Sequence, residues 1–315
     1  MLRAAAAIVV IGLLLAVVFS PRLGDSTVLL RAVHDFAHAP IFGAVALASL
    51  FALRAHERFA VQPIVRQYVL VFLLSLGLGL VTEIAQLFTG RDASWSDLRT
   101  DGLGAAAFLI AASAFDRVRA RVARAERLLL VLLALCVFAA SAAPVLRIAV
   151  AYWYRAQAFP TIVEFKRGSA ALFVLTRAAH ADIVAVPDEW SVRPGERALR
   201  VQLRGEQWPT VELAEVAPDW RHYRQLTLEL INPQSSELTL SIRIDDRQHN
   251  KRYEDRYNGR ILLAPRARTT IRIPLEEIAA GPRERKLDLA NVARLLLFKP
   301  SAAGETIYLV RVWLE

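Results

Sequence analysis

The sequence predicts two folds in one chain: an α-helical membrane bundle of about five transmembrane helices over residues 1–154, and an all-β sandwich of the jelly-roll type over residues 159–315. Composition gives the first reason, because a mean hydropathy of +0.34 with 55% hydrophobic residues exceeds what soluble domains carry. The hydrophobic pattern gives the second, because long apolar runs fill the first half and short alternating segments fill the second. The same composition excludes a disordered or collagen-like chain.

The first half contains five apolar runs that we interpret as membrane spans. The first, Ala4–Phe19, is uninterrupted, and bulky residues with Pro21 stand where signal peptidase requires small side chains, so we expect an uncleaved anchor helix. The other four are Ala37–Leu53, Tyr68–Phe88, Leu98–Phe115 and Leu128–Leu146. Of these, Leu98–Phe115 has the shortest apolar core and is rich in Gly and Ala, which suits packing inside a bundle better than contact with lipid.

Arginines in the short loops predict the orientation of these spans. One side of the bilayer receives nine arginines and the other four, and the richer side is cytoplasmic. An odd number of spans then places residues 159–315 outside the cytoplasm, and Tyr152, Trp153 and Tyr154 fit the aromatic belt at the outer interface. If the fourth run does not span, the second half lies in the cytoplasm. The nine are Arg3, Arg54, Arg58, Arg66, Arg117, Arg119, Arg121, Arg124 and Arg127, and the four are Arg22, Arg31, Arg91 and Arg99.

The second half alternates apolar and polar residues, the pattern of half-buried strands. Several short strands separated by turn signals are typical of an antiparallel sandwich, and we predict a jelly roll. The predicted strands are Leu199–Leu203, Leu226–Ile231, Leu238–Ile244, Thr269–Ile273, Val292–Phe298 and Ile307–Leu314. The turn signals include Asn232-Pro233, Asn258-Gly259, Ala264-Pro265 and Lys299-Pro300.

Charge and cysteine content exclude several classes of function. The net charge of +9 comes largely from arginine-rich loops at residues 54–66 and 117–127, which flank spans, so we expect contact with lipid head groups and no binding of nucleic acid. A single cysteine, Cys136, excludes a disulfide framework and a cysteine-rich metal site. Phosphate-binding glycine loops, Gly-x-Ser-x-Gly and His-Glu-x-x-His do not occur, and no cofactor is predicted.

Glu83 lies inside the third apolar run, and Gln86 follows on the same helix face. A charged residue in a span costs about 2.5 to 3.5 kcal/mol, so it should face the bundle interior with a partner. One interpretation is structural, in which Glu83 pairs with Arg91 or His38 and holds helices together. Another is cation binding by Glu83 with other polar residues, but two histidines at a spacing of four are a weak pattern, so no metal is predicted. Those other residues are His34, His38, Asp97 and Asp101.

A spaced set of residues runs through positions 30–115, namely His38, Phe42, Glu83, Gln86, Arg91, Asp97, Asp101 and Gly104. This set resembles the VanZ-like family of small bacterial membrane proteins, which shows a His at the start of one helix, Glu-x-x-Gln closing the next, and an Asp-x-x-x-Asn-x-x-Gly opening the last. The chain departs from the family in having His34-Asp35 before the His and Asp101 in place of Asn. The resemblance implies a multi-pass protein of the bacterial inner membrane. It implies a polar membrane cluster near the outer leaflet, comprising His38, Glu83, Gln86, Arg91, Asp97 and Asp101.

The most polar stretch of the second half, residues 243–258, combines aromatic rings with planar polar groups, as sugar-binding sites do. Residues 187–315 are similar to galactose-binding-like jelly rolls found as carbohydrate-binding modules. Such modules often hold a structural calcium, which we do not expect because the last strand lacks the acidic residue. The same composition also fits a structural hairpin or a surface for a protein partner. The candidate glycan-binding residues are Asp245, Asp246, His249, Tyr253, Arg256 and Asn258.

The functional hypothesis is a multi-pass membrane protein of VanZ-like type whose exported sandwich engages a cell-envelope glycan or a lipid-linked precursor without catalysis. One alternative is a membrane enzyme in which Glu83 or Asp97 acts as general acid or base on a lipid-linked substrate. A second alternative is a structural scaffold. The sequence does not define the oligomeric state.

Overall fold

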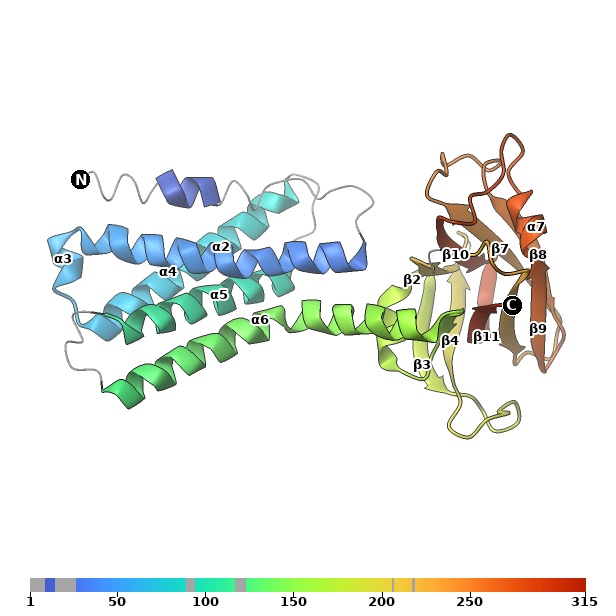
Figure 1. Ribbon diagram of the computed structural model, residues 1–315, viewed down its shortest axis with the longest axis horizontal. Coiled ribbons are helices and arrows are strands. Elements are labelled where there is room, and N and C mark those ends of the chain that lie inside the picture. The colour runs from blue at the N-terminus through green and yellow to red at the C-terminus, as the bar shows by residue number, and fades with distance from the viewer. Residues whose placement is uncertain (1–8, 15–26, 89–93, 117–122, 206, 217–218) are drawn as a thin grey trace. The chain divides into compact units, whose positions relative to one another are not determined.

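The computed structural model describes residues 9–14, 27–88, 94–116, 123–205, 207–216 and 219–315. Contacts divide the chain into two compact units, Met1–Ile148 and Ala149–Glu315, and the division falls within one long helix (Figure 1). The first unit is helical and the second is built from strands, as the change of hydrophobic period predicted.

Helices α2, α4 and α5 pack against one another in the first unit (Figure 1). Thr27 caps α2 by accepting a hydrogen bond from the Leu30 amide at 3.2 Å, and Ser94 caps α5 by accepting one from the Ser96 amide at 3.1 Å. Residues 9–14 are also helical. The helices are α2 (Val28–Arg54), α3 (Glu57–Ala60), α4 (Ile64–Leu87), α5 (Trp95–Ala114) and α6 (Arg124–Ala158).

Small residues allow α5 to approach α2 closely. A Cβ atom on Gly104 would lie only 2.0 Å from the backbone oxygen of Ala39, and one on Gly43 would lie 2.4 Å from the ring of Phe108. Ala105 and Ala107 are buried beside them. The Gly- and Ala-rich composition of this segment therefore serves helix packing inside the unit, as expected from the sequence.

Three helices of the described residues are long and apolar enough to cross a membrane, namely α2, α4 and α6. The predicted count of five transmembrane helices is not established by this finding. α5 is a helix, but Asp97, Arg99 and Asp101 in its first two turns leave it short of that criterion. Of the predicted anchor Ala4–Phe19, only residues 9–14 belong to the described part, and the rest lies outside it.

The second unit contains two antiparallel sheets (Figure 1). A six-stranded sheet has the order β3-β4-β11-β6-β9 with β1 paired to β11, and a five-stranded sheet has the order β2-β5-β10-β7-β8. From β4 to β11 the chain changes sheet at every step except the β7–β8 hairpin, which is the connectivity of a jelly roll. The elements are β1 (Thr161–Glu164), η1 (Gly168–Phe173), β2 (Val174–Arg177), β3 (Ala179–Ala185), β4 (Arg197–Gly205), β5 (Thr210–Ala214), β6 (Gln225–Asn232), β7 (Leu238–Asp246), β8 (Tyr257–Leu263), β9 (Ala267–Pro274), α7 (Leu275–Ala279), β10 (Val292–Phe298) and β11 (Ala302–Leu314).

All six predicted strands are confirmed, as β4, β6, β7, β9, β10 and β11. The prediction of a turn at Asn258-Gly259 is wrong, because both residues lie inside β8. The side-chain amide of Asn258 donates a hydrogen bond to the backbone oxygen of Tyr253 at 3.1 Å. Gly259 is required by crowding, since a Cβ atom would lie 2.7 Å from the Tyr257 hydroxyl.

The sandwich core is formed by the inward-facing residues of both sheets. Leu228 of β6, Leu240 of β7, Leu295 of β10 and Leu309 of β11 are fully buried. Trp220, in the segment that connects β5 to β6, is also fully buried in this core. Burial of a leucine side chain stabilises a fold by about 1.5 to 3 kcal/mol.

Substitution of Gly104 by Ala should lower the melting temperature of the helical unit, measured by circular dichroism on the full chain in detergent. The added methyl group meets the Ala39 backbone, and such overpacking costs about 1 to 3 kcal/mol. Gly77→Ala in α4 is the matched control, because nothing lies within 4 Å of its Cβ position and the substitution should be neutral or slightly stabilising. Equal melting temperatures for the two variants would contradict the close packing of α2 and α5.

Candidate functional sites

The first candidate site is the polar membrane cluster predicted from the sequence. His38 comes from α2, Glu83 and Gln86 from α4, and Asp97 and Asp101 from α5, and all five are between 1% and 4% exposed. One nitrogen of His38 and one carboxylate oxygen each of Glu83 and Asp101 lie within 4.8 Å of one another. The sixth predicted member, Arg91, lies outside the described residues.

Hydrogen bonds fix the orientation of these three side chains. Nδ1 of His38 lies 3.0 Å from Oδ1 of Asp101, and the Ser94 amide donates to Oε2 of Glu83 at 2.7 Å. The ring of His38 stacks on Phe42 with an angle of 12° between the planes. Glu83 therefore joins α4 to the first turn of α5, where the partial positive charge of a helix N-terminus favours a carboxylate.

The second candidate site is the polar β7–β8 hairpin, where Asp245 and Asp246 are only 1% and 2% exposed. Arg243 donates two hydrogen bonds to Asp245, at 2.8 and 2.6 Å, and Arg294 donates another at 2.7 Å. Arg285 donates two hydrogen bonds to Asp246, and a third at 2.5 Å to Asp255. The acidic residues of the hairpin thus hold arginines in place.

The electrostatics of the hairpin agree with this role. Burial raises the pKa of Asp245, but the hydrogen bonds and charge of Arg243 and Arg294 outweigh it and bring the pKa below its ordinary value. The hydrogen bond from Arg285 holds the pKa of Asp255 below its ordinary value. His249 is engaged on both ring nitrogens, with the Asp255 backbone oxygen at 2.8 Å and with Arg243 at 3.1 Å.

The other three predicted residues form the accessible part of the hairpin. Tyr253 is 63% exposed, and the guanidinium of Arg256 lies 4.9 Å from the centre of its ring. Nε of Arg256 donates to Asn258 Oδ1 at 3.0 Å. Tyr253 is therefore open to a ligand and Arg256 and Asn258 are partly so, whereas Asp245 and Asp246 are buried.

The structure adds a surface that the sequence analysis did not identify, namely the outer face of the five-stranded sheet, here called the sheet face. Its strand register places two rows side by side, because the intervening residues of each strand point into the core. The rows are Glu212, Leu296, Arg243 and Asn258, and Thr210, Phe298, Ser241 and Arg260.

Two exposed aromatic side chains lie beside the sheet face. Trp208, which is 54% exposed, precedes β5 and lies 5.8 Å from the ring of Phe298. Tyr253 lies beside the start of β8. The sequence signal for this surface was the alternation of inward and outward positions within residues 210–214 and 292–298. Once the order of the strands in the sheet is known, this alternation shows which side chains face outward.

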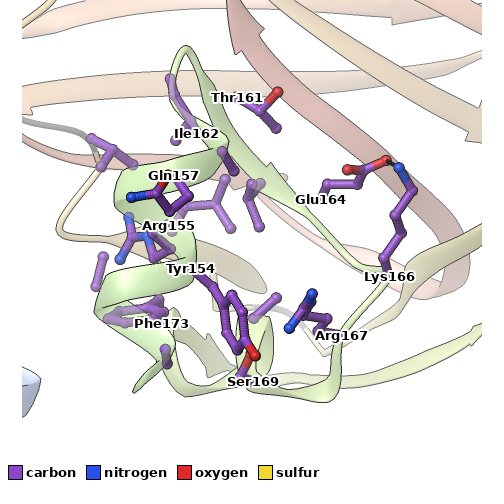
Figure 2. Close-up of a pocket in the computed structure, with 17 residues that line it drawn as sticks. Tyr154, Arg155, Gln157, Thr161, Ile162, Glu164, Lys166, Arg167, Ser169 and Phe173 are labelled. Carbon is purple, nitrogen blue, oxygen red and sulfur yellow. Dashed lines mark ion pairs between the residues drawn. The ribbon is translucent and has the colours of Figure 1, made fainter. Parts of the chain in front are cut away.

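The second unit also contains a pocket of about 280 Å³ between the end of α6, β1 and η1 (Figure 2). Figure 2 shows Arg155, Arg167 and Lys166 around it. Each is engaged, since Arg155 lies 3.9 Å from the ring centre of Phe173, Arg167 lies 3.6 Å from that of Tyr154, and Lys166 pairs with Glu164 at 2.8 Å. Of the aromatic residues predicted at the membrane interface, Tyr154 lines this pocket, Tyr152 donates to Glu215 and Trp153 is exposed.

Comparison with known proteins gives similarity for about half of the chain. A family 11 carbohydrate-binding module from Clostridium thermocellum, in complex with a β-1,3-1,4-mixed-linked tetrasaccharide, is 14% identical with a TM-score of 0.38, and the match covers 49% of this chain and 93% of the module. The CBM22-1 xylan-binding domain of Paenibacillus barcinonensis Xyn10C is 14% identical with a TM-score of 0.34, covering 49% and 94%. An exo-β-agarase is 12% identical with a TM-score of 0.40, covering 49% of this chain and 24% of the enzyme.

No family model and no curated protein matches the chain. The resemblance of residues 30–115 to the VanZ-like family therefore remains a prediction from the motif residues alone. What the similar modules bind belongs to those proteins, and the ligand of this chain has to be argued from its own side chains.

Replacement of Asp255 by Asn should destabilise the sandwich by about 1.5 to 3 kcal/mol at neutral pH, because Arg285 loses a charged acceptor. The loss should shrink as the pH falls toward 2. The folded pKa of Asp255 lies below its ordinary value of 3.8, so its contribution is present above that value and disappears as the pH falls through the folded pKa. Urea unfolding followed by tryptophan fluorescence measures this, since every tryptophan except Trp95 lies in the second unit.

Glu189→Gln is the control for this experiment, because it removes an exposed carboxylate from the same unit. Its effect on the free energy of unfolding should be small at all pH values. An Asp255→Asn effect that is the same at pH 7 and pH 2 would contradict the assigned ion pair.

Proposed function

We propose that this chain is a multi-pass protein of the bacterial inner membrane that holds its sandwich outside the cytoplasm. There the sandwich binds an envelope glycan, or the glycan part of a lipid-linked precursor, without catalysing a reaction. The observation that carries the proposal is the sheet face, where exposed Trp208 and Tyr253 adjoin fixed arginines.

The apolar surface of the helices supports the membrane part of the proposal. Only 11% of the most apolar window of α6 is buried, and Leu128, Leu129, Leu132 and Leu133 are exposed. Monomeric soluble proteins rarely present an apolar surface of this extent to water. A bilayer covers such side chains without any loss of hydrogen bonds, because a helix satisfies its own backbone groups.

The orientation rests on the arginine asymmetry of nine against four and on an odd number of spans. In this proposal α5 is counted as a span because α2 and α4 surround its polar first turns, which removes Asp97 and Asp101 from lipid. The segment Ala4–Phe19 supplies the first span. The sandwich then follows α6 on the outer side.

The chemistry of the sheet face suits a carbohydrate. A sugar ring presents an apolar face that packs on aromatic rings. Its hydroxyl groups accept hydrogen bonds from planar polar groups and donate hydrogen bonds to them. Buried Asp245 fixes Arg243 and Arg294 in position, so little side-chain entropy is lost when these arginines bind hydroxyl groups. Asp245 is thus a positioning residue, and Tyr253, Arg256 and Asn258 extend the surface toward β8.

Substitution of both Trp208 and Tyr253 by Ala should weaken glycan binding by at least about tenfold, since exposed aromatic anchors each contribute roughly 1 kcal/mol or more. Binding of the full chain in detergent micelles is measured on an array of bacterial envelope glycans, followed by calorimetry with the best binder. Trp313→Ala, which removes a tryptophan from the outer side of the six-stranded sheet, is the matched control and should bind as the wild type.

Two results would contradict the proposed function. One is the absence of binding to every envelope glycan by a folded wild-type chain, which would favour a scaffold. The other is equal loss of binding in the Trp313→Ala control and the double variant, which would place the ligand elsewhere.

A further inference from the structure

We propose that His38, Glu83 and Asp101 bind a divalent transition-metal ion, of the kind of Zn²⁺ or Mn²⁺, inside the helical unit. The three residues come from three different helices, α2, α4 and α5. This inference is independent of glycan binding by the sandwich.

The positions of the potential ligand atoms support this site. One atom from each residue lies within 4.8 Å of the other two. Ligand atoms about 2.1 Å from one ion lie about 3.0 to 4.2 Å apart, depending on the coordination geometry. The bound of 4.8 Å in the structure is close to that range.

Each of the three residues has a polar atom to spare. Within the part of the chain that the structure describes, Nε2 of His38, Oε1 of Glu83 and Oδ2 of Asp101 make no hydrogen bond, although all three side chains are at least 96% buried. A buried polar atom without a partner costs about 1 to 3 kcal/mol, and more when it carries charge. Unpartnered, buried oxygens on Glu83 and Asp101, in a cluster with a nitrogen of His38, indicate a bound cation.

Charge leads to the same conclusion. Glu83 and Asp101 are buried, and among the described residues neither forms an ion pair with a lysine or an arginine. The sandwich shows the opposite arrangement, in which arginines compensate buried Asp245 and Asp246. A divalent cation compensates Glu83 and Asp101 in the way that arginines compensate the sandwich residues.

The type of ligand narrows the kind of ion. Imidazole nitrogen favours transition metals, and carboxylate oxygen is compatible with Zn²⁺ and Mn²⁺ as well as with harder ions. One histidine with two carboxylates therefore fits a first-row divalent ion better than Mg²⁺ or Ca²⁺, which prefer oxygen ligands throughout.

The surroundings hold the ligands ready for such an ion. Oδ1 of Asp101 lies 3.0 Å from Nδ1 of His38, so these two ligands already face each other. The Ser94 amide holds the second oxygen of Glu83. Gly79 leaves room for the Asp101 carboxylate, since a Cβ atom there would lie 2.8 Å from Oδ2.

This result differs from the sequence-based prediction of no metal. That prediction weighed Glu83 with His34, His38, Asp97 and Asp101 as a cation-binding set and rejected it because two histidines at a spacing of four are a weak pattern. The structure brings His38, Glu83 and Asp101 together from α2, α4 and α5.

Metal content of the full chain, purified in detergent without a histidine tag, tests the proposal. The chain is stripped with EDTA, loaded with Zn²⁺ or Mn²⁺, dialysed and analysed by plasma mass spectrometry. The expected result is about one ion per chain and a higher melting temperature than the stripped protein has. His38→Ala, Glu83→Gln and Asp101→Asn should each lower the retained metal at least tenfold.

His56→Ala is the matched control, because it removes an exposed histidine from the same unit and should keep the metal. A wild-type chain that retains no ion above the level of the three variants would overturn the proposal, as would equal loss in His56→Ala.

Folding of the variants is followed in the same samples. If the site binds no metal, removal of a buried charge by Glu83→Gln or Asp101→Asn should raise the melting temperature or leave it unchanged. If the site binds a metal, EDTA should lower the melting temperature of the wild type but not that of these variants. If a variant fails to fold, Co²⁺ loaded into the wild type gives an independent readout. A Co²⁺ ion held by nitrogen and oxygen ligands of the protein has a visible absorption spectrum that differs from the spectrum of aqueous Co²⁺. A spectrum identical to aqueous Co²⁺ would overturn the proposal.

Discussion

The apolar outer surface of the helices is the constraint on which the arrangement of the first unit depends. Side chains such as Leu129, Leu133 and Val81 are exposed on apolar helices, and the polar groups of these helices lie inside. This constraint accounts for the burial of His38, Glu83 and Asp101, and for the use of Gly104 where α5 approaches α2. Once the polar groups are inside, they need partners, and the described helices supply them only in part.

Buried carboxylates have different consequences in the two units. In the sandwich each one is met by arginines, and the result is a rigid surface in which Asp245 fixes Arg243 and Arg294. In the helical unit a backbone amide contacts Glu83 and a histidine contacts Asp101, which leaves one oxygen of each carboxylate without a hydrogen bond among the described residues. The first arrangement supports a binding surface at the protein exterior, and the second supports the coordination of an ion.

Much of the architecture follows from hydrophobic period, and the remainder depends on contacts that period does not encode. Segments such as 238–244 and 292–298 alternate clearly because one face is core, and they were predicted as strands. β1 and β2 were not predicted, because four residues are too few to show a clear alternation. Asn258-Gly259 carries a turn signal, but the hydrogen bond from Asn258 to the backbone oxygen of Tyr253 accompanies a strand there. Burial of Asp245 depends in part on Arg294, which is distant in sequence, so the sequence could not show that Asp245 is buried while Tyr253 is exposed.

The side of the membrane on which the sandwich lies tests the account most directly. Single cysteines are placed at the exposed positions Arg260 in β8 and Ala125 at the start of α6, in a chain whose Cys136 is replaced by Ser. Intact bacterial cells are then treated with a membrane-impermeant thiol reagent. The account predicts labelling at position 260 in intact cells and at position 125 only after lysis. Protection of position 260 until lysis would place the sandwich in the cytoplasm and contradict its binding of an envelope glycan.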